Sequence, residues 1–112
     1  MERVILKKLH CIVNDEIDKD EIYLKCDGKK IWPKGIYMRI DTNETFDLEN
    51  TIVETESEKI EIEIWDFDYL TANDLLGTFE MIPGNEKGNF TTSMKSKNFS
   101  STASYILAWS VE

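Results

Sequence analysis

Strict alternation of apolar and acidic residues over positions 60–64 is the feature that most constrains the fold of this chain. Residues 60–65 read Ile-Glu-Ile-Glu-Ile-Trp, which places three isoleucines on one face and two glutamates on the other, as in a half-buried strand. Continuing the same alternation past the strand places Asp66 and Asp68 on the isoleucine face. The sequence therefore predicts a strand whose buried face ends in two carboxylates.

The rest of the chain also favours short strands over helices. No window shows the helical period, and turn signals such as Asp27-Gly28 recur throughout. A length of 112 residues with 41% hydrophobic residues suits one domain, spanning 1–112. We predict an all-β fold, an eight-stranded antiparallel β-sandwich, with a strand at 90–94 and a polar connection at 95–102. Counting strands places the loop at 15–20 at one end and the Asp27-Gly28 turn at the other.

Charge and hydropathy exclude several classes of function. The net charge of −9 argues against binding nucleic acid, because binding to phosphates draws on lysine and arginine. The same charge argues against constitutive docking on anionic lipid. No apolar run reaches the roughly 18–20 residues of a membrane span, so we expect no transmembrane segment and a cytoplasmic location. Cys11 and Cys26 are expected to be free thiols.

A catalytic constellation is missing from the sequence pattern. His10 is the only histidine and lies on a predicted strand, with no serine or cysteine arrangement that it could serve as a base. A zinc site from His10, Cys11 and Cys26 lacks the usual ligand spacing. We therefore expect a protein that is not an enzyme.

Acidic residues gather on two predicted loops. Asp66 and Asp68 are followed by Asp74 after a polar tip, and Asp15 and Asp20 continue the inward faces of two other strands. Carboxylates placed close together raise one another's pKa unless a cation neutralises them, and calcium takes six to eight such oxygen ligands. The alternative is a pair of solvated turns whose aspartates cap backbone amides.

Two segments resemble a known family. Residues 64–68 (Ile-Trp-Asp-Phe-Asp) followed by 74–77 (Asp-Leu-Leu-Gly) resemble the third calcium loop of C2 domains, the calcium- and phospholipid-binding β-sandwiches. Residues 20–25 (Asp-Glu-Ile-Tyr-Leu-Lys) resemble the stretch that follows the first loop of that family. The resemblance covers nearly the whole chain, and 64–77 is its most specific part.

The resemblance implies a set of calcium ligands in this chain. Asp20, Asp66, Asp68 and Asp74 would supply carboxylates, and Phe67 would supply a backbone carbonyl.

The first loop departs from the family pattern at the position of the remaining ligand. The family usually has an aspartate six residues before the position of Asp20, where this chain has Asn14. Asp15 is one residue late by spacing but correct by strand alternation, so we predict Asp15, with Asn14 as a neutral substitute. A lost charged ligand would weaken calcium binding or reduce the number of ions.

The loop tips also carry apolar side chains. Ile17, Tyr69 and Leu70 are the candidates for contact with a membrane or a partner once calcium is bound. The resemblance thus implies calcium-dependent docking to an anionic phospholipid headgroup or to a protein, peripheral to the membrane. The alternative is a calcium-independent adaptor or scaffold that binds through an edge strand or a sheet face.

Overall fold

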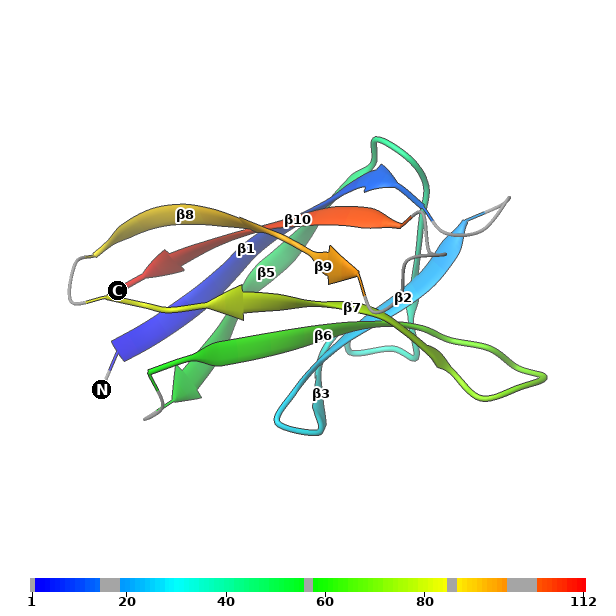
Figure 1. Cartoon of the computed structure of the whole chain (residues 1–112), viewed down its shortest axis with the longest axis horizontal. Coiled ribbons are helices and arrows are strands. Elements are labelled where there is room, and N and C mark those ends of the chain that lie inside the picture. Colours follow the sequence, from blue (N-terminus) through cyan, green and yellow to red (C-terminus); the bar gives the residue numbers. More distant parts are fainter. Residues whose placement is uncertain (1, 15–18, 56–57, 85–86, 97–102) are drawn as a thin grey trace.

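Two β-sheets packed face to face make up the computed structural model of the chain (Figure 1). The structure describes residues 2–14, 19–55, 58–84, 87–96 and 103–112, and every regular element within them is a strand. The strands are β1 (Glu2–Val13), β2 (Asp20–Cys26), β3 (Lys29–Trp32), β4 (Met38–Ile40), β5 (Thr45–Thr55), β6 (Ile60–Asp66), β7 (Asp74–Met81), β8 (Gly88–Ser93), β9 (Lys95–Ser96) and β10 (Ser104–Val111).

The strand order confirms the predicted antiparallel β-sandwich. One sheet has the order β5-β1-β10-β8, and the other has the order β3-β2-β6-β7-β9, with β4 also paired to β2. All of these pairings are antiparallel. The predicted count of eight strands is wrong, because the described residues form ten.

A change of sheet near Met94 accounts for part of the difference. The chain pairs with β10 as far as Ser93, and the N–H of Met94 then donates a 2.9 Å hydrogen bond to the carbonyl of Tyr105. The following residues pair with β7 in the other sheet, where Ser96 lies opposite Gly77. A segment expected to be one strand and a polar connection is therefore two strands in two sheets.

Gly77 permits the close approach of β9 to β7. A Cβ atom at this position would lie 2.3 Å from the carbonyl oxygen of Lys95 and 2.8 Å from the side chain of Met94. Cβ atoms essentially never make contacts this short, so position 77 requires glycine for steric reasons. The space is too small for any side chain.

The alternating residues predicted from sequence fill the space between the sheets. On β6 the three isoleucines are buried, at 3%, 0% and 0% exposure, while Glu61 is exposed and Glu63 half-buried. Side chains from β1 and β10 meet them from the opposite sheet. The largest fully buried side chains are those of Tyr105, Phe79, Leu6, Leu9, Ile22, Leu24, Ile40, Leu48, Ile62, Ile64, Met81 and Leu107.

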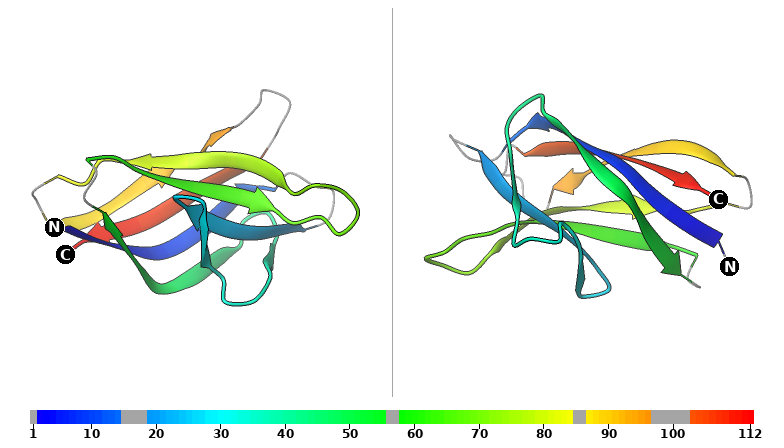
Figure 2. Two further views of the ribbon diagram at one scale, coloured as in Figure 1. Left: turned by 90° about the horizontal axis from the view of Figure 1, so that it is seen from below. Right: turned by 180° about the vertical axis from the view of Figure 1, so that it is seen from behind.

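The two ends of the sandwich differ in what they carry. Both views of Figure 2 place the termini at one end and the β6–β7 loop at the opposite end of the molecule, which is 41 Å long. The predicted hairpin turn between β2 and β3 is present, with positive φ at Asp27 (52°) and Gly28 (78°). Cys11 and Cys26 are free, as predicted. Within the described residues no helix is long and apolar enough to cross a membrane.

Candidate functional site

Pairing of β2 with β6 brings two of the predicted acidic segments to the same end of the sandwich. In this antiparallel ladder Ile22 lies opposite Asp66, so the first residue of β2, Asp20, lies just beyond the last residue of β6. On the other side of β6, Asp66 lies opposite Asp74, the first residue of β7. The start of β2, the end of β6 and the start of β7 therefore lie at the same end of this sheet (Figure 1), and the residue at each of these positions is an aspartate.

Asp20 is fully buried between the sheets. Its Oδ2 atom accepts a 2.5 Å hydrogen bond from the hydroxyl of Tyr105, which lies on β10 of the opposite sheet. Burial, together with the bond to Asp20, raises the pKa of Tyr105 far above its ordinary value. Burial also raises the pKa of the neighbouring Cys11 thiol to about 11, so the thiol stays protonated and unreactive at neutral pH.

Asp66 is also buried, at 4% exposure, as its place in the alternation predicted. Its Oδ1 atom accepts a 3.0 Å hydrogen bond from the backbone N–H of Glu21. The carbonyl of Glu21 in turn accepts a 2.7 Å hydrogen bond from the N–H of Phe67. These bonds fix the side chain of Asp66 beside the start of β2, next to Asp20.

Asp68 departs from the predicted alternation. β6 ends at Asp66, the chain turns, and Asp68 is exposed. Its carboxylate accepts hydrogen bonds from the N–H groups of Leu70 (2.8 Å) and Thr71 (3.3 Å) and from the Thr71 hydroxyl (2.8 Å). These bonds, the one from the Leu70 amide first, lower the pKa of Asp68 below its ordinary value. In this respect Asp68 matches the alternative expectation of an aspartate that caps its own loop.

The loop is closed by a second set of hydrogen bonds from Asn73. Its Oδ1 atom accepts a 2.9 Å hydrogen bond from the N–H of Asp68, and its Nδ2 atom donates one of 2.8 Å to the hydroxyl of Tyr23. Asn73 thereby ties the tip of the β6–β7 loop to β2. Hydrogen bonds of the Asp68 and Asn73 side chains therefore hold the β6–β7 loop in this conformation.

The predicted ligands are only partly brought together. Asp20, Asp66 and Asp74 lie at the same end of the sheet, the first two buried and Asp74 exposed. Within the described residues no three His, Cys, Asp or Glu side chains come close enough to hold a metal ion. Asp15 and Ile17 lie outside the described residues. The predicted contact residues Tyr69 and Leu70 are exposed, at 71% and 94%.

No protein family and no curated protein matches the sequence. Among solved structures, a C2 domain of plant extended synaptotagmin 1 (its domain A) superposes with a TM-score of 0.52 at 11% identity, covering 99% of this chain and 92% of that one. Another C2 domain gives a TM-score of 0.51 at 12% identity, with coverages of 99% and 96%. The chain has the C2 fold. At 11% and 12% identity, the similarity shows the arrangement of the strands and says nothing about bound ligands.

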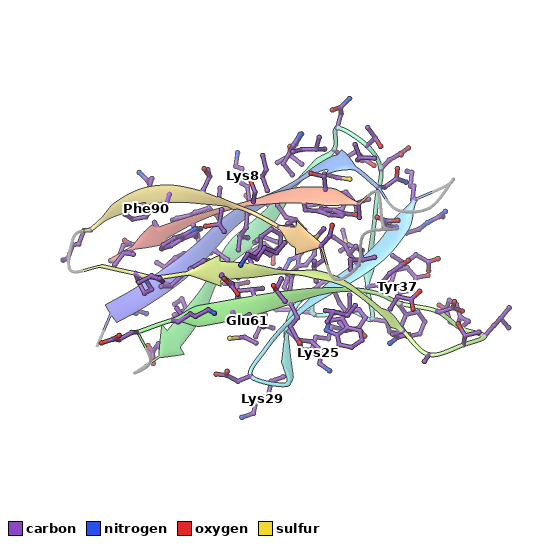
Figure 3. All side chains as sticks on the ribbon, viewed as in Figure 1. Lys8, Lys25, Lys29, Tyr37, Glu61 and Phe90 are labelled. Atoms are coloured by element: carbon purple, nitrogen blue, oxygen red, sulfur yellow. The ribbon has the colours of Figure 1, made fainter. Side chains whose placement is uncertain are left out.

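On this C2 fold, an aromatic cluster of Tyr37, Phe67 and Tyr69 was not foreseen. Tyr37 stacks on Phe67 with ring centroids 5.4 Å apart, and Tyr69 meets Phe67 edge-on at 4.8 Å. The hydroxyls of Tyr37 and Tyr69 are 3.3 Å apart, and this hydrogen bond, with a smaller effect of Glu21, raises the pKa of Tyr37 to about 12. Figure 3 shows Tyr37 beside the β6–β7 loop.

No local signal in the sequence points to this cluster, because it depends on the long-range pairing of β4 with β2. Glu21 and Tyr105 were missed for a similar reason. Their roles arise from contacts with Asp66 and Asp20, which are far away in the sequence. The partner of a residue on a neighbouring strand can be assigned only after the strand order is known.

Proposed function

We propose that this C2-fold chain is a calcium-binding interaction module, with the ion held at the end of the sandwich that carries Asp20, Asp66, Asp68 and Asp74. The observation that carries the proposal is the placement of Asp66 directly opposite Asp74 in the β6–β7 ladder, with the buried Asp20 beside them. Like charges placed directly opposite each other destabilise a sheet. A divalent cation removes that repulsion.

The donor set suits calcium. Carboxylate oxygens on loops are the ligands that calcium prefers, and Asp15 and the Phe67 carbonyl would complete a set contributed by two loops. A carboxylate has about four lone-pair positions, so hydrogen bonds such as those from Tyr105 and from the Glu21 amide are compatible with a cation on the same carboxylates. When bound, calcium would supply open coordination positions for a phosphate or carboxylate of the target.

The apolar loop tip supports docking to a target as the role of the module. Leu70 is 94% exposed, and Tyr69, which packs against the rings of Tyr37 and Phe67, is 71% exposed. Aromatic and aliphatic side chains on a loop next to an ion suit either the interface of an anionic membrane or a pocket on a protein. We propose binding, not catalysis, as the activity.

Isothermal calorimetry tests the ion. We expect heat on addition of calcium to the wild-type chain and none with Asp66→Asn combined with Asp74→Asn. Asp27→Asn, which removes an exposed carboxylate in the β2–β3 turn, at the end of β2 remote from Asp20, should titrate as the wild type does. Asparagine is suited to the positive φ of position 27. Equal heats from the wild type and the double variant would rule out this site.

Sedimentation with vesicles tests the target. With calcium present, vesicles of phosphatidylcholine and phosphatidylserine should carry the wild-type chain down, and Leu70→Ser should weaken this without changing the heat of calcium binding. Calcium heat without sedimentation would point to a protein target instead of a lipid.

A calcium-independent adaptor is the second candidate, and one observation favours it. Asp20, Asp66 and Asp68 each accept hydrogen bonds from the protein itself, so the loop end is held together by its own donors. This candidate predicts no heat with calcium. It also predicts capture of a protein partner in the presence of a chelator, lost on substitution of Tyr69 and Leu70.

A further inference from the structure

The outer edge of β8 is an exposed row of backbone groups without a strand partner among the described residues. β8 is the last strand of the sheet β5-β1-β10-β8, and in the described part of the chain it pairs with β10 alone (Figure 1). Its residues Asn89, Phe90, Thr91 and Ser93 are exposed. The N–H and C=O groups of such an edge are available for pairing with another strand.

The ladder with β10 determines which backbone groups of β8 point outward. The N–H of Met94, the residue directly after β8, donates a 2.9 Å hydrogen bond to the carbonyl of Tyr105 on β10. Hydrogen-bonded and non-hydrogen-bonded pairs alternate along an antiparallel ladder, and this ladder has no register shift over Gly88–Ser93. Every second residue of β8 therefore directs its N–H and C=O away from β10. These residues are Asn89, Thr91 and Ser93.

The other sheet edges within the described residues carry features that hinder pairing. β5 is bulged opposite β1, has positive φ at Glu49 (55°) and Asn50 (54°), and bears several acidic side chains. β3 begins with two lysines and is followed directly by Pro33, and β4 and β9 are only three and two residues long. Charges, bulges, proline and short length are the usual protection of an edge strand. β8, with the sequence Gly-Asn-Phe-Thr-Thr-Ser, has no charged residue and no proline.

We propose that β8 pairs with β8 of a second copy of this chain, antiparallel about a two-fold axis at Thr91. In this register Thr91 lies opposite Thr91 of the other copy, and Asn89 lies opposite Ser93. All of these residues direct their backbone groups outward, so each pair exchanges two backbone hydrogen bonds. Two copies with a net charge of −9 repel each other over most surfaces, whereas this edge places only uncharged side chains opposite one another.

The side chain of Phe90 supports the same register. Phe90 is 38% exposed and stacks on Trp109 with the ring centroids 4.8 Å apart. In the dimer it lies opposite Thr92 of the other copy, and an aromatic side chain beside a β-branched one is a favourable cross-strand pair. The first charged residue after β8, Lys95, pairs with β7 and forms a 3.1 Å ion pair with Glu80, so it lies outside the new ladder.

The interface is small, which sets its strength. A stable dimer buries roughly 800 Å² on each partner, and edge-to-edge contact of two six-residue strands covers less than this. The dimer is therefore weak and forms at high protein concentration. Figure 3 shows Phe90 well away from Tyr37 at the loop end, so the proposal is independent of the calcium site.

Amide hydrogen exchange, followed by NMR in the presence of a chelator, tests the pairing residue by residue. The outward amides of Asn89, Thr91 and Ser93 should exchange at least about tenfold more slowly at about 1 mM chain than at about 50 µM. The amides of Phe90 and Thr92, which point towards β10, are the internal control and should exchange slowly at both concentrations. Sedimentation over the same range should show a rise from the mass of one chain towards that of two.

Two substitutions of Thr91 should keep the chain monomeric. Thr91→Pro removes an outward N–H without removing a hydrogen bond to β10, and proline is accepted on the free side of an edge strand. Thr91→Lys places two like charges opposite each other across the two-fold axis. Thr78→Lys, the same substitution on half-buried Thr78 in the other sheet, is the matched control and should dimerise as the wild type does.

Three outcomes would overturn the proposal. The first is a wild-type chain that stays monomeric at about 1 mM, with fast exchange at Thr91 at both concentrations. The second is slow exchange of the Thr91 amide in the monomer, which would mean that another part of the same chain covers the edge. The third is a Thr91→Lys chain that dimerises as strongly as the wild type, which would place the interface on another surface.

Discussion

The hydroxyl of Tyr105 donates a 2.5 Å hydrogen bond to the carboxylate of Asp20, joining β10 of one sheet to β2 of the other across the buried interior. The bond holds a carboxylate at the mouth of the core without exposing it to water. It therefore links the stability of the sandwich to the conformation of the loop end.

Substitution of Tyr105 by Phe should lower the free energy of unfolding by about 2 kcal/mol, because a buried acceptor loses a donor. Urea denaturation measures this. Tyr69→Phe, which removes an exposed hydroxyl with a longer hydrogen bond of 3.3 Å, is the control and should change the stability little. A Tyr105→Phe chain as stable as the wild type would mean that Asp20 does not depend on this bond.

The stability should fall in alkaline solution through Cys11. Its pKa in the folded chain is about 11, above its ordinary value of 9.0, because burial disfavours the thiolate. The unfolded chain therefore loses this proton first, so the stability that the raised pKa contributes is complete below pH 9 and is lost as the pH rises towards 11. Linkage gives a loss of about 2 kcal/mol over this range. Urea melts at several pH values should show a shallower decline for Cys11→Ala than for the wild type, and parallel declines would contradict this assignment.

Position 77 on β7, where β9 pairs with it, should tolerate no residue other than glycine. Gly77→Ala would force Cβ within 2.3 Å of the Lys95 carbonyl, so we expect a loss of about 1–3 kcal/mol and the detachment of β9. Gly35→Ala is the control, because a Cβ at position 35 meets no atom within 4 Å. Thermal melting of both variants distinguishes them, and equal melting temperatures would contradict the close approach.

Hydrogen exchange should report on the order of the β6–β7 loop. Asp68→Ala removes the acceptor of the Leu70 and Thr71 amides, so both should exchange faster, by roughly a factor of several. Because the pKa of Asp68 is lowered in the folded chain, the same loosening should appear in the wild type as the pH falls through that pKa, below the ordinary value of 3.8. Unchanged exchange at Leu70 in the variant would show that other contacts hold the loop.

The sequence predicted those parts of the structure that depend on local alternation. The isoleucines of β6 and the buried Asp66 follow from a period of two, and the turn at Asp27 and Gly28 follows from its residue types. The resemblance to C2 domains, stated from two short segments, is matched by the fold.

What the sequence did not predict depends on contacts between distant segments. The change of sheet at Met94 is not visible in the local sequence pattern, because it depends on the pairing of Lys95 and Ser96 with β7, a strand about 18 residues earlier in the chain. Asp68 leaves the alternation because hydrogen bonds within its loop compete with the strand. Partners of Asp20 and Asp66 could not be assigned before the strand order was known. The calcium ligands stay a prediction.

Thermal melting with and without calcium is the most direct test of the central proposal. An ion that binds only the folded chain must raise its melting temperature, by an amount that corresponds to about 2.7 kcal/mol at one hundred times the dissociation constant. We expect a higher melting temperature for the wild type with calcium than with chelator, and no difference for Asp66→Asn with Asp74→Asn. A wild-type chain that melts at the same temperature in saturating calcium and in chelator would contradict the calcium site and leave the adaptor as the function of this fold.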